Sequence, residues 1–407
     1  MKRNAVNNLI DWKENGTQVP FLLVGTKGTG KTYLAIEFAL AYYPQYLYVN
    51  FELNAVARDF FSKLSEENVT ISEMVAQYFQ IDERYLAELV VILDEITFCP
   101  AIMHALEQEC LLHVIAISGL LPTSEQEKKF CVCRLLPLGF DEFLSAVGSD
   151  WYIDIIQGHF QNQKPVPDIV HQELLALFEE YLIVGGMPAA VNEYISSKSV
   201  YNVSEVHAML KNRMRAVVEQ VYPEKDAGKA EQIINVLPEQ LKRDNKKFRF
   251  NSIRKGVTYS LYKDSISELE QCGMVLRLNE QKKEGHFKLY LPDVGMLSSA
   301  FYGEESESIR KALLENYVMQ TLLSGGQQQL CFWESDALAK VDFIVCNAKE
   351  ETPVELRIST NGKSKSIASY WSANPEKHRN YYRFGFENFD STPVMTQIPY
   401  YAVFCIK

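Results

Sequence analysis

The sequence predicts an α/β fold that begins with a doubly wound parallel sheet. Short runs of apolar and β-branched residues recur in the first third of the chain, and each ends in glycine, acidic or other polar residues. Patterns typical of helices separate these runs. Strands that alternate with helices form parallel sheets, because each helix carries the chain back across one face of the sheet.

Four runs have the length and composition of strands. They are Phe21 to Val24, Tyr46 to Phe51, Leu89 to Leu93, and Val114 to Ile117. In an open parallel sheet, ligands bind outside the carboxyl ends of the strands. We therefore expect the functional residues of this part of the chain directly after these runs.

A glycine-rich loop follows the first run and leads into a helical pattern from Tyr33 to Ala39. Glycines let backbone N–H groups turn inward around phosphates, and the helix N-terminus adds partial positive charge. In this pattern Lys31 reaches the β- and γ-phosphates and Thr32 ligates Mg²⁺. The sequence therefore predicts a P-loop that binds ATP with Mg²⁺, formed by Gly25, Thr26, Lys27, Gly28, Thr29, Gly30, Lys31 and Thr32.

The third run ends in Asp94 and Glu95, the arrangement expected of a Walker B element. Asp94 would hold the metal through its water shell, and Glu95 would polarise the attacking water. The catalytic prediction is thus Glu95 with Lys31. Ser118, at the end of the fourth run, either senses the γ-phosphate or caps a turn.

Composition limits the other classes of function. The net charge of −11 excludes a globally basic surface, so any DNA contact must come from a local patch. The eight cysteines are scattered without a CxxC pair, which indicates reduced thiols. No apolar run is long enough for a signal peptide or a membrane span, so we expect a cytoplasmic protein.

Beyond the nucleotide site, two segments carry a resemblance to a known family. Leu136 to Leu144 reads LPLGFDEFL, and Gly185 to Val191 reads GGMPAAV. With the P-loop, they resemble the bacterial and archaeal AAA-type ATPases that carry a C-terminal domain of unknown function related to the PD-(D/E)xK nucleases. The resemblance implies an ATPase domain, a helical lid, a winged-helix-like domain and an α/β restriction-endonuclease-like domain, at residues 1–150, 151–228, 229–302 and 303–407.

The patterns in the middle of the chain agree with that implication. They predict helices at Lys229 to Leu241 and Tyr259 to Gln271, then a hairpin of Val275 to Leu278 with His286 to Leu291. Between Lys242 and Lys255 there are seven basic residues and one acid. This run is either a DNA-contacting surface or a solvated face.

The C-terminal third resembles the nuclease-like part of the family in the segments Leu314 to Val318, Phe332 to Glu334, Lys340 to Phe343 and Pro353 to Arg357. The resemblance implies that Glu315, Asp342 and Glu355 converge on Mg²⁺. Arg357 stands where a catalytic lysine is expected, and arginine cannot act as a base. Lys340 replaces a glutamate. The domain is therefore either an active nuclease or a degenerate fold that binds or scaffolds.

Three functions follow as hypotheses. The first is an ATP-hydrolysing switch that couples nucleotide state to the winged-helix and nuclease-like domains. The second is an ATP-gated nuclease or DNA-binding defence protein. The third is a module that binds nucleotide without turnover. A protein partner or self-association is compatible with each of them.

Overall fold

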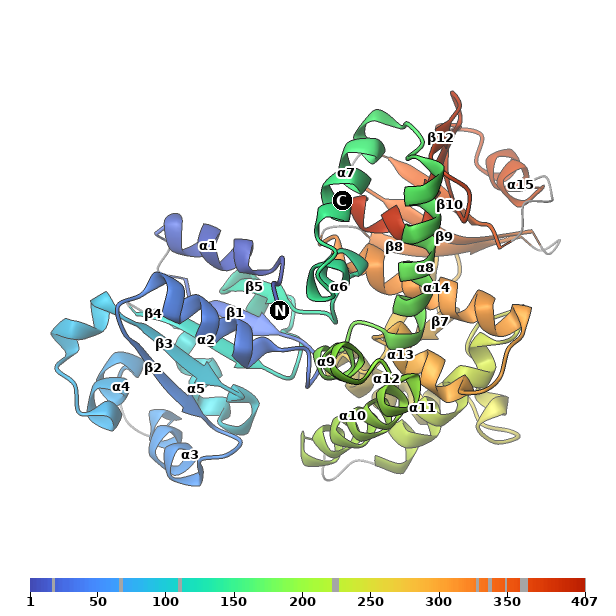
Figure 1. Cartoon of the computed structure of the whole chain (residues 1–407). Coiled ribbons are helices and arrows are strands. Elements are labelled where there is room, and N and C mark those ends of the chain that lie inside the picture. The colour runs from blue at the N-terminus through green and yellow to red at the C-terminus, as the bar shows by residue number, and fades with distance from the viewer. Residues whose placement is uncertain are drawn as a thin grey trace.

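The computed structural model describes residues 1–16, 19–65, 69–108, 112–221, 227–326, 329–335, 339–347, 350–358 and 365–406. Two bodies are visible, an N-terminal one built on a small sheet and a larger one that holds the remainder of the chain (Figure 1). Helices α9 and α10 of the larger body lie beside the N-terminal one.

The N-terminal body is a parallel sheet of five strands in the order β2-β3-β4-β1-β5. The four predicted strands are confirmed within one or two residues, and a fifth, β5, lies beside β1. The bounds are β1 Phe21–Val24, β2 Tyr46–Asn50, β3 Val90–Asp94, β4 His113–Ser118 and β5 Cys131–Arg134.

Helices cover both faces of this sheet, which confirms the doubly wound fold. Phe21 and Leu23 of β1 pack in the core beneath α1 and α2, whereas Leu22 and Val24 pack in the core beneath α3, α4 and α5. This alternation follows from the two-residue period of a strand. The helices are α1 Val6–Glu14, α2 Lys31–Tyr42, α3 Ala55–Ser62, α4 Ile71–Phe79 and α5 Pro100–Leu106.

The second body contains an eight-stranded mixed sheet in the order β12-β13-β11-β10-β9-β8-β6-β7. Its strands are β6 Leu276–Glu280, β7 Phe287–Tyr290, β8 Gln329–Glu334, β9 Lys340–Cys346, β10 Glu351–Leu356, β11 Tyr381–Gly385, β12 Asp390–Ser391 and β13 Met395–Pro399. Its helices are α6 Phe140–Ala146, α7 Trp151–Asn162, α8 Asp168–Val184, α9 Pro188–Ser197, α10 Val200–Val221, α11 Ala227–Leu241, α12 Tyr259–Gln271, α13 Val294–Ser298, α14 Glu307–Ser324 and α15 Lys365–Ala373.

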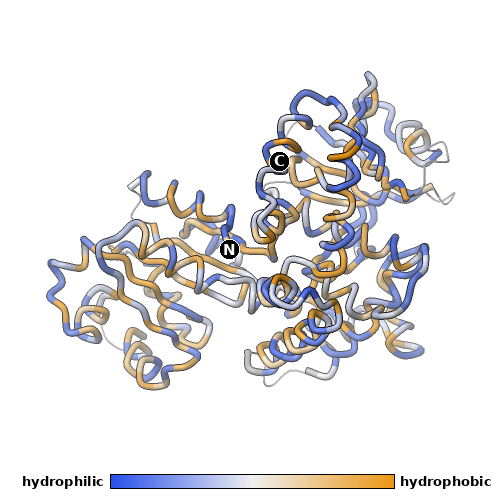
Figure 2. The backbone as a smooth tube through the Cα atoms, viewed as in Figure 1, coloured by the Kyte–Doolittle hydropathy of each residue, from blue (hydrophilic) through white to orange (hydrophobic). Residues whose placement is uncertain are grey.

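Short 3₁₀ helices complete the described elements. They are η1 Lys63–Ser65, η2 Glu83–Glu88, η3 Ile96–Phe98, η4 Gln126–Lys128, η5 Phe250–Ser252, η6 Ser299–Phe301 and η7 Tyr400–Cys405. Hydropathy follows the layers, since apolar segments run along the strands of the N-terminal sheet and hydrophilic segments gather in the outer loops (Figure 2).

Most buried apolar residues of the second body share one core, and a smaller cluster of Trp333, Val341, Ile344, Ile367 and Tyr370 lies between β8, β9 and α15. The expected helices and hairpin of the middle region are present, but β6 pairs in parallel with β8, so the hairpin is the edge of the C-terminal sheet. One apolar cluster extends from Phe140 to Ile406. The predicted boundary at 302/303 therefore falls inside a continuous sheet, because strand pairing joins segments that the sequence pattern separates.

No single helix in the described ranges is long and apolar enough to cross a membrane. Helices α8 and α9 reach that length and composition only when they are taken together, and they are bent by 119° at their junction. The seven described cysteines are free thiols, and Cys110 lies outside the described residues.

The two motifs that carried the family resemblance meet at a joint between the bodies. We define the joint as Leu136–Gly139, Gly185–Pro188 and Pro292–Gly295. The Leu138 N–H donates to the Gly186 carbonyl at 2.7 Å, and the Gly186 N–H donates to Asp293 Oδ2 at 2.6 Å. A Cβ added at Gly186 would lie 2.1 Å from the Leu138 carbonyl oxygen. Only glycine permits this close approach.

Candidate functional site

The predicted P-loop connects β1 to α2, as the sequence indicates. Gly28 and Gly30 have φ values of 92° and 91°, a left-handed conformation that favours glycine. Helix α2 begins at Lys31, so the N–H groups of its first turn have no partner within the helix. These free donors and the positive end of the helix form a cradle for phosphate.

The Lys31 side chain is buried in this loop, with 4% of its surface exposed. Its ammonium group donates to the carbonyls of Gly25 at 2.7 Å and Thr26 at 3.3 Å. Burial lowers the pKa of Lys31, and the nearby carboxylates of Glu95 and Asp94 oppose that effect. The carbonyl oxygens carry only partial negative charge, so an anionic phosphate group would be a stronger partner for the Lys31 ammonium.

Asp94 is the polar centre of the site. Its Oδ2 accepts hydrogen bonds from Thr32 Oγ1 at 3.0 Å, Tyr48 Oη at 2.8 Å and Asn50 Nδ2 at 2.9 Å. Its Oδ1 is buried without a hydrogen-bond partner among the described residues. An unpartnered carboxylate oxygen beside a threonine hydroxyl fits Mg²⁺, which prefers oxygen ligands.

Sequence reasoning did not find Tyr48 and Asn50. Both lie on β2, and Asn50 is paired in register with Asp94 on β3. The signal that could have found them is the alternation of β2, which places residues 48 and 50 on the same face. Their positions beside Asp94 depend on the strand order, which the sequence alone does not give.

Glu95 follows Asp94 in a left-handed conformation, with φ of 55°. Such backbone is uncommon for a residue with a side chain and concentrates at functional sites. Burial raises the pKa of Glu95, and the Lys31 ammonium opposes that rise. A Cβ added at Gly119 would lie 3.5 Å from Glu95 Oε2, so the carboxylate lies next to the end of β4.

Ser118 lies at that same end of β4 and is fully buried. Its hydroxyl donates to the Leu120 carbonyl at 2.8 Å and accepts from the Leu120 N–H at 2.9 Å. These bonds favour the turn-capping interpretation over the γ-phosphate sensor.

The outer side of the P-loop contacts the second body. Thr26 Oγ1 donates to the Gly273 carbonyl at 2.7 Å. A Cβ at Gly28 would lie 3.2 Å from both Leu210 of α10 and Met187 of the joint. The loop is therefore held by three segments far away in the sequence, and none of these contacts was predicted.

The N-terminal segment adds another contact. Arg3 donates to the Thr29 carbonyl at 2.7 Å and to the Leu136 carbonyl at 2.6 Å, and it forms an ion pair with Glu142. Lys27, at the tip of the loop, forms an ion pair with Glu52. The remaining loop residues thus have defined neighbours on both sides.

The nuclease-like carboxylates have a different environment. Glu315 Oε1 lies 2.9 Å from the ammonium of Lys246, and Asp342 Oδ1 lies 3.1 Å from that of Lys288. Lys288 also lies 4.0 Å from Glu315 Oε2. Burial by itself would lower the pKa of Lys288, but attraction to Asp342 and Glu315 outweighs it and raises that pKa. Two lysines therefore supply the positive charge expected from a metal.

Glu355 belongs to a separate group. Its carboxylate lies 3.3 Å from Arg357 Nε and 2.8 Å from Arg383 Nε. No three His, Cys, Asp or Glu side chains among the described residues are grouped so that they could hold a metal ion. The implied convergence of Glu315, Asp342 and Glu355 on Mg²⁺ stays a prediction, and among the described residues the partners of these carboxylates are lysine and arginine side chains.

The basic run from Lys242 to Lys255 is divided between paired and exposed residues, and Arg243, Arg249, Arg254 and Lys255 are exposed. Lys246 is buried against Glu315, Lys247 pairs with Glu280 at 3.0 Å and Glu334 at 2.7 Å, and Lys242 pairs with Glu304 at 3.4 Å. Paired cations have less charge available for phosphates. Among the basic residues of this run only Lys246 is buried, in an ion pair that the sequence did not indicate.

Comparison with known families divides the chain into three segments. Residues 17–144 match an AAA domain, residues 175–307 match a domain of unknown function, DUF8612, and residues 310–401 match another, DUF4143. A search of curated proteins found no match. The segment that matches an AAA domain is thus the one that holds the parallel sheet, the P-loop and Asp94.

Two solved structures are similar to the chain. One is a Walker-type ATPase of Pyrococcus abyssi, at 13% identity and a TM-score of 0.44 over 74% of this chain and 95% of that one. The other is a signal transduction ATPase with numerous domains and a tetratricopeptide repeat sensor from Pyrococcus horikoshii, at 15% identity and 0.31 over 80% and 46%. Both TM-scores are below 0.5, so these likenesses do not extend the assignment.

Proposed function

We propose that this protein is a Mg²⁺-dependent, ATP-hydrolysing switch whose nucleotide state changes the position of the second body. The observation that carries the proposal is the double contact of the P-loop. Its inner side forms the phosphate cradle, and its outer side packs against Leu210, Met187 and Gly273. A change in the conformation of the loop would therefore alter its contacts with the second body.

Each residue of the site has a proposed role. Lys31 would leave the Gly25 carbonyl to bind the β- and γ-phosphates. Thr32 and the free Oδ1 of Asp94 would hold Mg²⁺, which neutralises charge that develops on the phosphates. Glu95, whose pKa is raised by burial, would orient the attacking water and accept its proton.

The joint offers a route from this site to the rest of the molecule. The Leu135 N–H donates to the Val24 carbonyl at 2.7 Å, directly before the P-loop. Leu138 then contacts Gly186, and Tyr181 Oη donates to the Leu138 carbonyl at 2.6 Å. Gln320 of α14 donates to Tyr181 Oη at 2.9 Å. Hydrogen bonds thus connect the loop to the core of the second body.

The hydrolysis claim is tested by Glu95→Gln. We expect the variant to bind ATP and Mg²⁺ as the wild type does but to release phosphate at least about a hundredfold more slowly, because it has lost the carboxylate base. Steady-state phosphate release and equilibrium nucleotide binding measure the two properties. Equal release by both proteins would contradict hydrolysis at this site, and binding would still stand.

For the C-terminal part we propose a scaffolding role. The buried pairs of Lys246 and Lys288 with Glu315 and Asp342 support it, because they occupy the carboxylates that cleavage would need. Incubation of the protein with plasmid and linear DNA in Mg²⁺ or Mn²⁺ tests the alternative of a nuclease. Cutting that is lost in Asp342→Ala would overturn the scaffolding role.

A further inference from the structure

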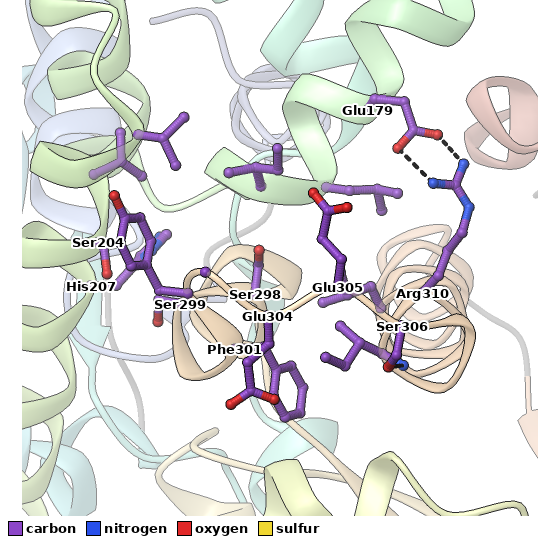
Figure 3. Close-up of a pocket in the computed structure, with 18 of the residues that line it drawn as sticks. Glu179, Ser204, His207, Ser298, Ser299, Phe301, Glu304, Glu305, Ser306 and Arg310 are labelled. Carbon is purple, nitrogen blue, oxygen red and sulfur yellow. Dashed lines mark hydrogen bonds and ion pairs between the residues drawn. The ribbon is translucent and has the colours of Figure 1, made fainter.

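A cavity of about 920 Å³ lies in the second body, and none of the predicted nucleotide-site residues lines it (Figure 3). It is bounded by α8, α10, η6 and the N-terminal half of α14. Leu182, Val203, Ile309 and Leu313 give it apolar walls. Its size and lining are those of a site for a small organic molecule.

Polar groups without partners face this cavity. His207 lines it and is fully buried, and its ring nitrogens make no hydrogen bond of good geometry among the described residues, although the backbone of Val184 lies close enough to favour the charged ring. The nearest carboxylate oxygen, Asp293 Oδ1, lies 3.8 Å from Nε2. Burial lowers the pKa of His207 to about 4, so the ring is neutral and can accept a hydrogen bond. A buried polar group without a partner is costly unless a ligand or water satisfies it.

The charge of the cavity is negative. Glu179 is neutralised by its ion pair with Arg310, and Glu304 pairs with Lys242. Glu305 also lines the cavity, at a side that is exposed to solvent (Figure 3). No ion pair or hydrogen bond of the Glu305 side chain occurs within the described part of the chain. A cationic group on a ligand could therefore form an ion pair with the Glu305 carboxylate.

We propose that this cavity binds a small organic amine, with its ammonium group at Glu305 and its apolar part against α8, α10 and α14. The neutral ring of His207 would accept a hydrogen bond from the ligand. An anionic ligand is disfavoured because Glu305 would repel it.

The site is connected to the P-loop through α10, a step that rests on the proposed function. His207 faces the cavity, and Leu210, one turn later on the same helix, contacts Gly28. Lys211 of the same turn donates to Ser299 Oγ at 3.0 Å, at the cavity wall. An amine that moves α10 would therefore change the rate of ATP turnover.

Calorimetric titration of the full chain without nucleotide tests the binding, with hexylamine as the probe and hexanol and hexanoate as probes of equal length. We expect saturable binding of hexylamine, at least about tenfold weaker binding of hexanol, and none of hexanoate. Glu305→Gln should weaken hexylamine binding about tenfold. Glu205→Gln, an exposed carboxylate on α10 outside the cavity, is the matched control and should bind as the wild type does.

A second variant, Ser204→Trp, fills the cavity without removing charge and should abolish binding. The proposal is overturned if hexylamine does not bind, if hexanoate binds equally well, or if both variants bind normally. Phosphate release with and without hexylamine tests the coupling, and an unchanged rate overturns the coupling. A wild type that releases no phosphate contradicts the proposed function instead, since the titration needs no nucleotide.

Discussion

Asp94 shows how one residue acquires its role from several parts of the chain. Its position after β3 follows from local sequence, but the three donors to its Oδ2 come from α2 and β2. These bonds fix the carboxylate so that its other oxygen stays free. Hydrogen bonds from neighbouring residues that hold a metal ligand in one orientation prepare the site to bind its metal.

Asp293 and His207 give a residue-scale prediction about pH. Burial raises the pKa of Asp293 to about 6, from an ordinary value of 3.8. Its contribution to stability is therefore complete below pH 3.8 and is lost as the pH rises through 6. Burial lowers the pKa of His207 from 6.5 to about 4, so its contribution is present above pH 6.5 and is lost as the pH falls through 4.

Urea unfolding of Asp293→Asn and His207→Gln between pH 4 and pH 7 measures these contributions. The cost of Asp293→Asn relative to wild type should decrease by about 3 kcal/mol as the pH rises over this range. The cost of His207→Gln should increase by about the same amount. Slopes of equal sign for the two variants would contradict the assignment.

At the scale of elements, the joint explains the two glycines of Gly185-Gly186-Met187-Pro188. Gly186→Ala would place a methyl group 2.1 Å from a backbone oxygen, and the backbone cannot rotate away as a side chain can. We expect a loss of about 3 kcal/mol in the free energy of unfolding, measured in urea.

Gly158→Ala is the matched control for this prediction. Gly158 lies within α7, and a Cβ there would have nothing within 4 Å. The change should stabilise the protein by up to about 1 kcal/mol, since alanine favours a helix over glycine. Two variants with the same stability would show that the joint tolerates a side chain.

At the scale of the whole molecule, a buried ion pair fastens the basic run to the core of the second body. Lys246→Met leaves Glu315 with a weaker counter-charge, so we expect a cost of about 3–5 kcal/mol in urea unfolding. Lys263→Met, at an exposed lysine on α12, should stay within about 0.5 kcal/mol of the wild type. The double variant Lys246→Met with Glu315→Gln should recover part of the loss.

Coupling between the two bodies makes another prediction at this scale. When Glu95→Gln is saturated with ATP and Mg²⁺, amide hydrogen exchange should change in α9, in α10 and around Gly273, because these segments contact the P-loop. Helix α15 lies on the side of the second body away from the N-terminal one and serves as the internal control (Figure 1). Changes in exchange that are confined to residues before Phe140 would contradict the proposed switch, whereas nucleotide binding would remain supported.

The strands around the nucleotide site and its candidate residues could be predicted from local sequence patterns. Gly28, Gly30, Lys31 and Asp94 could be assigned because a phosphate loop depends on local backbone conformation and on residues adjacent to a strand. The strands around them were predicted for the same reason, since strand period and helix start are local properties.

The neighbours of these residues depend on contacts between distant parts of the chain. Tyr48 reaches Asp94 through strand order, and Lys246 and Lys288 form ion pairs with Glu315 and Asp342 through packing. Leu210 reaches the P-loop through the contact between the two bodies. These contacts join residues far apart in the chain, and their choice depends on the burial and pairing of the whole molecule, which no local pattern records.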